Sequence, residues 1–383
     1  MAYTFLTPKK IISGENSLKE AAATLSTLGK KACIITDEMM VLLNNAAKVE
    51  EVLKEIGVDY AIYSGINSEP NDLMIKDATA FYKENGCDFL IALGGGSPID
   101  SAKAVGILLS SDAKLSSYMG KTIDIAMPNL VAIPTTAGTG SEATKFTIIN
   151  DTETTTKMLL SGPCLIPSLA IIDPVFTMSA PKSVTSHTGI DALCHAVESF
   201  TSRKRQPLSD TFALSAIKRI FENLLVCYEE PQNAQARIQM SLAALEAGIS
   251  FNNSSVTIVH GMSRPLGALF HVPHGLSNAM LLEGCMDFAL SGAIDRFALI
   301  ARSLNLTNDP DDETAAKVFL EELKKLLSQL NVPTMSEFGI DRETYFSHID
   351  KMASDAYASG SPANTMREVS VEDMKQLYAA IYR

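Results

Sequence analysis

The order in which two hydrophobic patterns follow each other constrains the fold of this chain more than any other feature. In the first half, short apolar runs alternate with helical stretches; these runs lie at 31–37, 58–65, 87–96, the start of 129–144, and 169–174. Such alternation predicts a parallel sheet that helices cover on both faces. After about residue 183 we find helical periodicities, at 184–201, 207–229, 233–250, 275–289, 293–304, 312–330, 341–357 and 371–382.

This change of pattern predicts two domains, which the length of 383 residues also favours, because one hydrophobic core rarely organises so long a chain. Pro174 and Pro181 mark the change. We expect residues 1–180 to form an α/β domain with a mostly parallel, doubly wound sheet. Residues 181–383 should form an all-helical domain. The cleft between two such domains is a common place for a ligand.

Composition excludes some partners. A net charge of −12 argues against nucleic acid, since phosphate binding needs a basic stripe. No apolar run approaches the roughly 20 residues of a membrane span, so we expect no membrane partner. Six scattered cysteines without a paired spacing indicate reduced thiols, and hence a cytoplasmic protein.

Three consecutive glycines end the most apolar strand-like run. Gly94, Gly95 and Gly96 are followed by Ser97, which we expect to cap the next helix, and by Pro98 in its first turn. Glycines let backbone N–H groups approach an anion, and the start of a helix favours negative charge, so we expect a pyrophosphate here. A merely tight turn is the alternative, although it needs only one glycine. The spacing differs from the GxGxxG fingerprint.

A second glycine-rich loop follows another strand. It carries hydroxyl groups at Thr135, Thr136, Thr139 and Ser141. Two such loops on one sheet suit a dinucleotide better than a single phosphate. Asp37 ends an earlier strand, where a carboxylate can bind an adenosine ribose and repel a 2′-phosphate, which favours NAD over NADP. Asp37 can equally be a helix cap or a turn residue.

Four side chains form a candidate metal site. Asp191 and His195 are four residues apart in a predicted helix, so both can reach one ion. His260 and His274 follow in "VHGMSRPLGALFHVPH". One carboxylate and three imidazoles suit a borderline divalent ion such as Fe²⁺ or Zn²⁺, between which the ligand set does not decide. A lone histidine is more often an ordinary interior residue.

Together these segments resemble the iron-containing (group III) alcohol dehydrogenases. The matching motifs are "GGGSPIDSAKA", "IPTTAGTGSEAT", "GIDALCHAVESF", "VHGMSRPLGALFHVPHG" and "SPANTMRE". The resemblance implies a dehydroquinate-synthase-like fold, in which residues 1–180 are the dinucleotide-binding domain and residues 181–383 the helical domain with the metal and the catalytic groups. It also implies a metal held by Asp191, His195, His260 and His274 (iron before zinc), NAD(H) as cofactor, and a homodimer or larger homo-oligomer. Its implied cofactor contacts are Asp37, Asn71, Gly94, Gly95, Gly96, Ser97, Asp100, Thr135, Thr136, Thr139, Ser141, Thr144 and Lys157.

One position departs from the family pattern. Many members have a second histidine four residues after the third ligand, where this chain has Arg264. A guanidinium stays protonated and cannot pass on a proton as an imidazole does. Arg264 therefore either pairs with an acidic side chain or with the cofactor pyrophosphate, or it binds an acidic group of the substrate. We name His271 as a candidate proton relay; a surface or outer-shell role is its alternative.

The predicted activity is hydride transfer between NAD(H) and a short aldehyde or alcohol, a small molecule that carries an anionic terminus, for example a semialdehyde or sulfoacetaldehyde. A plain short-chain alcohol or diol dehydrogenase is the alternative. A dehydroquinate-synthase-like lyase is a more distant one, because such an enzyme needs a strongly basic pocket and the metal region offers little beyond Arg264.

Overall fold

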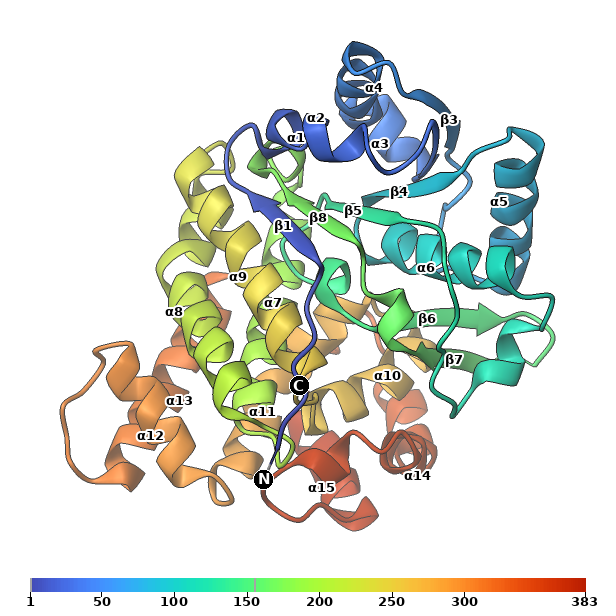
Figure 1. Ribbon diagram of the computed structural model, residues 1–383. Helices are drawn as coiled ribbons and strands as arrows, with labels where there is room; N and C mark the ends of the chain where they lie inside the picture. The colour runs from blue at the N-terminus through green and yellow to red at the C-terminus, as the bar shows by residue number, and fades with distance from the viewer. Residues whose placement is uncertain (1, 155) are drawn as a thin grey trace. The chain divides into compact units, whose positions relative to one another are not determined.

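The computed structural model describes residues 2–154 and 156–383, which form two compact units (Figure 1). The α/β unit is Leu6–Ala180. The helical unit joins Pro181–Arg383 with the residues up to Phe5. Phe5 stacks on Phe212 of the helical unit, with ring centroids 5.8 Å apart, which explains why the start of the chain packs with the second unit.

A six-stranded parallel sheet forms the centre of the α/β unit, in the order β1-β8-β5-β4-β2-β3. Its strands are β1 (Lys10–Ser13), β2 (Lys31–Ile35), β3 (Asp59–Tyr63), β4 (Phe89–Gly94), β5 (Leu130–Pro134) and β8 (Leu169–Ile172). Together with the helical second unit, it confirms the predicted fold class. The strand β1 was not predicted; it is a short edge strand with exposed ends.

Helices cover both faces of this sheet, as the doubly wound pattern requires (Figure 1). The helices of this unit are α1 (Ser17–Glu20), α2 (Ala22–Leu25), α3 (Glu38–Leu42), α4 (Asn45–Glu55), α5 (Asp72–Glu84) and α6 (Gly96–Ser110). Along the fully buried β4, Leu90 and Ala92 face α5 and α6, whereas Phe89, Ile91 and Leu93 face α1, α2 and α4. A strand buried on both faces needs a continuous apolar run, and "FLIAL" supplies it.

An antiparallel hairpin, which the sequence did not predict, stands beside the main sheet. It consists of β6 (Phe146–Asp151) and β7 (Thr156–Ser161). Ile149, Met158 and Leu160 pack into the core around α5 and α6. The hairpin thus anchors the chain directly after the second glycine-rich loop.

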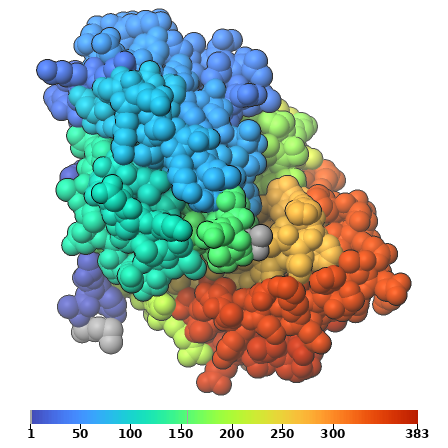
Figure 2. Space-filling view, turned by 90° about the vertical axis from the view of Figure 1, so that its right-hand side faces the viewer, coloured from blue at the N-terminus to red at the C-terminus, as the bar shows by residue number. Residues whose placement is uncertain are grey.

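The helical unit holds nine α-helices in its described residues: α7 (Lys182–Phe200), α8 (Pro207–Glu229), α9 (Ala234–Asn252), α10 (Ile258–Phe270), α11 (His274–Leu290), α12 (Ile294–Ser303), α13 (Asp312–Gln329), α14 (Arg342–Ala358) and α15 (Val371–Ile381). The helices α14 and α15 pack together, and this last part of the chain is red in Figure 2. Within the described part of the chain, no helix is long and apolar enough to span a bilayer.

The helix α10 was missing from the predicted helices because its sequence disfavours a helix. It contains Gly261, Pro265 and Gly267. Packing compensates for the low propensity: Ile258, Met262 and Leu266 are fully buried on one face of the helix. A Cβ atom at Gly261 would lie 2.5 Å from Pro362 Cγ, so glycine allows the close approach of the segment around Pro362.

Candidate metal centre and nucleotide-binding edge

Three helices of the helical unit position the four predicted metal ligands. Asp191 and His195 lie one turn apart on α7, His260 lies in the first turn of α10, and His274 begins α11. The three helices contact one another. Gly275 permits the start of α11 to approach α7, because a Cβ atom there would lie 2.5 Å from the carbonyl oxygen of His187.

The three imidazoles converge on one carboxylate oxygen. Asp191 Oδ1 lies 3.5 Å from His260 Nε2, 3.8 Å from His274 Nε2 and 4.0 Å from His195 Nε2. The ligand atoms of Asp191, His195 and His260 all lie within 4.8 Å of one another. The structure thus brings together four side chains from three separate helices.

These distances fit a bound divalent ion. Ligand atoms about 2.0–2.2 Å from a tetrahedral ion lie roughly 3.3–3.6 Å from one another, which is close to the observed spacing. The donor set of one carboxylate and three imidazoles suits iron or zinc. The side chain of His274 is 45% exposed, whereas that of Asp191 is 2% exposed, so the centre is accessible from the His274 side. A catalytic ion requires such an open side.

Burial and mutual charge shift the pKa values of these groups. Burial raises the pKa of Asp191, but the three histidines outweigh it and hold the pKa well below its usual range. Burial lowers the pKa of His195 to about 3. Burial also acts to lower the pKa of His260, but Glu198 and Asp191 overcome it and raise the value to about 9. The carboxylate is therefore ionised, and His195 offers a neutral ring to a cation.

Glu198, one turn beyond His195 on α7, supports the ligand His260. Its Oε2 contacts His260 Nδ1, which fixes the ring so that Nε2 faces Asp191. Its Oε1 accepts hydrogen bonds from Thr257 Oγ1 at 2.8 Å and from Val259 N at 2.7 Å, where α10 begins. A carboxylate behind a ligand histidine sets its tautomer and raises its basicity.

Arg264 follows His260 by one helical turn, on the same side of α10. Its guanidinium Nη1 donates a hydrogen bond to Ser361 Oγ at 3.2 Å. Across residues 2–154 and 156–383 the guanidinium forms no ion pair within 4.0 Å. Burial lowers the pKa of Arg264, and the more distant charge of Glu198 partly offsets this. His271 ends α10 with a φ of 54° and is exposed.

The predicted cofactor residues all belong to the α/β unit. In its sheet, β3 lies on one side of β2, whereas β4, β5 and β8 follow on the other side. The strand order therefore reverses between β2 and β4, and ligands of open α/β sheets bind outside the carboxyl ends of the strands at such a point. Asp37 follows β2, and Gly94 to Gly96 follow β4.

The two glycine-rich loops meet at this edge. Gly94 pairs with Pro134, and Thr135 N donates to the Gly94 carbonyl at 2.9 Å. A Cβ atom at Gly96 would lie 3.1 Å from Thr139 Cγ2, and one at Gly95 would lie 3.4 Å from Thr136 Oγ1. Thr136 Oγ1 is buried and has no hydrogen-bond partner in the described residues, as a group aimed at a ligand would.

The helix after the glycines begins earlier than expected. Gly95, not Ser97, is the residue before α6, so Ser97 and Pro98 lie inside the first turn. Gly94 has a φ of 153°. It also has to be a glycine because a Cβ atom at this position would lie 2.4 Å from Pro98 Cγ. Ser97 N–H is therefore among the free donors at the start of the helix, where an anion binds.

Other predicted cofactor residues have structural partners. Asp37 Oδ1 accepts a hydrogen bond from Met40 N at 2.9 Å, so Asp37 caps α3, and burial raises its pKa. Asn71 caps α5 through Leu73 N and Met74 N. Lys157, on the exposed hairpin, pairs with Glu69 at 2.8 Å. These hydrogen bonds and this ion pair give each of the three residues a structural role even when no nucleotide is bound.

A buried lysine, which sequence analysis missed, anchors the second loop. Lys103 Nζ donates to Thr144 O at 2.8 Å, Thr144 Oγ1 at 3.0 Å and Phe146 O at 2.7 Å. Asp100 Oδ2 accepts from Ile148 N at 2.9 Å. Two residues of α6 thus hold the segment that ends the loop. Ser141, at the start of the short helix within this loop, donates its backbone N–H to Thr139 Oγ1 at 3.3 Å.

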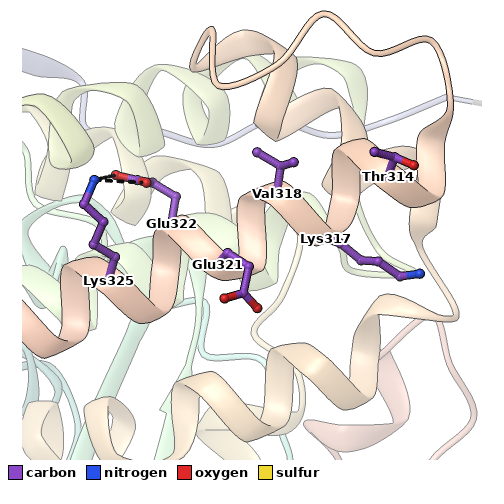
Figure 3. Close-up of a pocket in the computed structure, with 6 residues that line it drawn as sticks. All are labelled: Thr314, Lys317, Val318, Glu321, Glu322 and Lys325. Carbon is purple, nitrogen blue, oxygen red and sulfur yellow. Dashed lines mark hydrogen bonds and ion pairs between the residues drawn. The ribbon is translucent and has the colours of Figure 1, made fainter.

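Two surface hollows lie elsewhere on the helical unit. One, of about 610 Å³, lies along α13, and Glu322 and Lys325 on its wall pair with each other (Figure 3). The other, of about 450 Å³, lies among α11, α13 and α15, where Arg383 pairs with Glu283. Neither hollow includes a predicted site residue.

The fold and the site together define a nicotinamide-dependent, metal-dependent dehydrogenase. The family profile "Iron-containing alcohol dehydrogenase" matches residues 8–174, and "Fe-containing alcohol dehydrogenase family, C-terminal" matches residues 185–382. The chain belongs to this family, which binds NAD(H) and a divalent metal, and it is an alcohol dehydrogenase.

Individual relatives extend over nearly the whole chain. It is 33% identical to 1,3-propanediol dehydrogenase of Klebsiella pneumoniae, over 92% of each chain. It is 30% identical to NAD-dependent methanol dehydrogenase of Bacillus methanolicus, over 98% of this chain and 99% of that protein. A crystal structure of 1,3-propanediol oxidoreductase covers 100% of both chains at 30% identity, with a TM-score of 0.96.

Proposed function

We propose that this enzyme interconverts a short alcohol and its aldehyde with NAD(H), at a centre in which Asp191, His195, His260 and His274 hold ferrous iron. When bound, the ion polarises the substrate oxygen, and the nicotinamide donates or accepts the hydride. The convergence of three imidazole nitrogens on Asp191 Oδ1 carries this proposal. Asp37, with its carboxylate near the expected adenosine ribose, supports NAD over NADP.

The finer proposal is that the substrate carries an anionic terminus, such as a carboxylate or a sulfonate, which Arg264 binds. Arg264 lies one turn from a metal ligand, and its hydrogen bond goes to the neutral hydroxyl of Ser361 rather than to a carboxylate. Glu198 is engaged with His260 and with the start of α10. The positive charge of Arg264 therefore lacks a close counter-charge in the helical unit, and a buried cation needs one.

A proton must also reach or leave the substrate oxygen. Arg264 remains protonated and cannot transfer it. We assign this transfer to His271 or, alternatively, to solvent through a ribose hydroxyl of the cofactor. His271 is accessible to solvent at the end of α10, which suits exchange of a proton with water.

A plain short alcohol or a diol is the second candidate substrate. It is supported by the names of two similar proteins, a 1,3-propanediol dehydrogenase and a methanol dehydrogenase. In that case Arg264 neutralises the cofactor pyrophosphate. The two candidates predict opposite responses to a change at Arg264.

The test is a substrate panel with wild-type protein and the variants Arg264→Ala, Arg264→Lys and Arg264→His. We compare kcat/KM for succinic semialdehyde, sulfoacetaldehyde and propanal by following NADH oxidation. A charge-assisted contact worth about 1.5–3 kcal/mol gives the wild type a preference for the anionic aldehydes of about 10- to 100-fold. Arg264→Ala should abolish that preference, and Arg264→Lys should keep part of it.

Two results would contradict the proposal at different levels. If wild type prefers propanal, or if Arg264→Ala keeps the preference for anionic aldehydes, the anionic terminus is wrong. If no alcohol or aldehyde is turned over by the iron-loaded enzyme, the dehydrogenase proposal itself fails. Metal analysis of the isolated protein checks iron against zinc.

A further inference from the structure

Asn278 contacts the metal centre but is not one of the predicted ligands. It lies on α11 four residues after His274, so both side chains emerge from the same side of the helix. Its side chain is completely buried. An amide buried in this position needs hydrogen-bond partners, and those partners are the ligand atoms themselves.

The amide nitrogen of Asn278 approaches three of the four ligands. Nδ2 lies 2.7 Å from Asp191 Oδ1, 3.2 Å from His260 Nε2 and 3.4 Å from His274 Nε2. Asp191 Oδ1 accepts a hydrogen bond from this amide, whereas the role of each ring nitrogen depends on its tautomer. The shortest contact goes to the carboxylate, where the hydrogen bond is charge-assisted.

The other end of the same amide is unsatisfied. Within the described part of the chain, the buried Oδ1 of Asn278 has no hydrogen-bond partner. No donor around Oδ1 therefore fixes the orientation of the amide. The acceptors at the metal centre fix it, which ties the side chain to the centre rather than to general packing.

We propose that Asn278 is a positioning residue of the metal centre, whose amide keeps Asp191, His260 and His274 at ligand spacing and thereby increases metal affinity. Without the amide, Asp191 Oδ1 would lose a hydrogen bond of 2.7 Å, and the three ligand side chains would lose the group that lies between them. A centre that is already assembled loses less conformational freedom when the ion binds. This inference rests on the metal centre of the proposed function but not on its substrate.

The experiment measures metal affinity rather than activity. Metal-free wild type, Asn278→Val and Asn278→Ala are titrated with Zn²⁺ against a chromophoric chelator. Valine approximates the volume and excludes water, whereas alanine leaves room for a water that can replace one donor. Loss of such a supporting group weakens metal binding by about 10- to 100-fold. We expect Asn278→Val to weaken Zn²⁺ binding by about 100-fold and Asn278→Ala by about tenfold.

Two further measurements separate positioning from a general loss of structure. The Co²⁺ absorption spectrum of Asn278→Ala should change in the visible bands that report ligand geometry. NADH affinity should remain within about twofold of wild type, since the predicted nucleotide residues lie in the α/β unit. Met286→Leu, a buried conservative change on the same helix, is the matched control and should bind Zn²⁺ as wild type does.

The outcomes that overturn the inference are distinct. Unchanged Zn²⁺ affinity in both Asn278 variants would show that the amide is dispensable. Tighter binding would show that the amide competes with the ion instead of preparing its site. If the wild-type protein binds neither Zn²⁺ nor Fe²⁺, the metal centre of the proposed function is wrong, and the role of Asn278 is wrong with it.

Discussion

Glu198 and His260 form a buried pair in which the carboxylate contacts Nδ1 of the ring whose Nε2 lies 3.5 Å from Asp191 Oδ1. The pair connects two helices: Glu198 lies on α7, and His260 lies in the first turn of α10. One carboxylate thus orients a proposed metal ligand and accepts the backbone N–H of Val259 at the start of the helix that carries it. The metal centre and the packing of α7 against α10 therefore depend on the same side chain.

Replacement of Glu198 should reduce both metal affinity and stability. Glu198→Ala removes the partner of His260 and leaves buried donors unpaired, so we expect a loss of about 3 kcal/mol or more in the free energy of unfolding and metal binding weaker by about 10- to 100-fold. Glu198→Gln keeps one amide oxygen as an acceptor and should lose less of each. Thermal melting and Zn²⁺ titration measure the two effects; an alanine variant with wild-type metal affinity would contradict the assigned role.

Asp37 should determine the choice between NADH and NADPH without being essential for folding. Asp37→Asn removes the negative charge but keeps an oxygen that can cap α3 through Met40 N. We expect the ratio of NADPH to NADH affinity to increase by about tenfold or more, because the repulsion of a 2′-phosphate disappears. Fluorescence titration measures both constants.

Asp37→Ala is the control for the helix cap. Because alanine cannot accept the hydrogen bond from Met40 N, this variant should also lose about 1 kcal/mol in the free energy of unfolding. If Asp37→Asn leaves the cofactor preference unchanged, the carboxylate does not face the ribose, and Asp37 is a helix cap only.

Glu142, beside the second glycine-rich loop, should make stability depend on pH. Burial raises the pKa of Glu142 to about 7, from an ordinary value of 4.5, although the charge of Lys103 opposes this. The folded state holds the proton more tightly than the unfolded state. The stabilisation is therefore complete below about pH 4.5 and is lost as the pH rises through about 7. Burial lowers the pKa of Lys103 to about 8, so Lys103 contributes no pH dependence in this window.

The measurement compares wild type with Glu142→Gln, which cannot ionise, at pH 5 and at pH 7.5. We expect the stability of wild type to fall relative to Glu142→Gln by about 1–3 kcal/mol between these values. Titrating groups remote from Glu142 are common to both proteins and cancel in the difference. Lys103 cancels only in part, because the charge of Glu142 raises its pKa. Parallel pH profiles of the two proteins would show that Glu142 is ionised throughout.

Local patterns predicted much of the fold because the same property produces the pattern and the structure. The apolar run of β4 is buried on both faces, and the helical spacing of Asp191 and His195 places both at the metal centre. Where local preference and tertiary packing disagree, the prediction was wrong. The helix α10 forms despite Gly261, Pro265 and Gly267, because its apolar side is buried and Gly261 admits Pro362.

Some of the missed residues left a signal in the sequence. Asn278 follows His274 by four residues, the spacing that also relates Asp191 to His195, so a polar residue there could have been assigned to the centre. Lys103 gave no such signal, because a lysine in a helix is ordinarily exposed. Its burial depends on Thr144 and Phe146, whose carbonyl groups reach it only after the hairpin has folded against α6.

The sequence by itself determined the elements that follow from periodicity, the glycine-rich strand ends, and the residue types able to bind an ion. Only the tertiary structure decided which atoms meet: Asp191 Oδ1 with three imidazoles, Glu198 with His260, and Asn278 between the ligands. The physical reason is range. The backbone hydrogen bonds within a helix and the spacing of its side chains act over a few residues, whereas contacts between distant residues depend on how the helices α7, α10 and α11 pack.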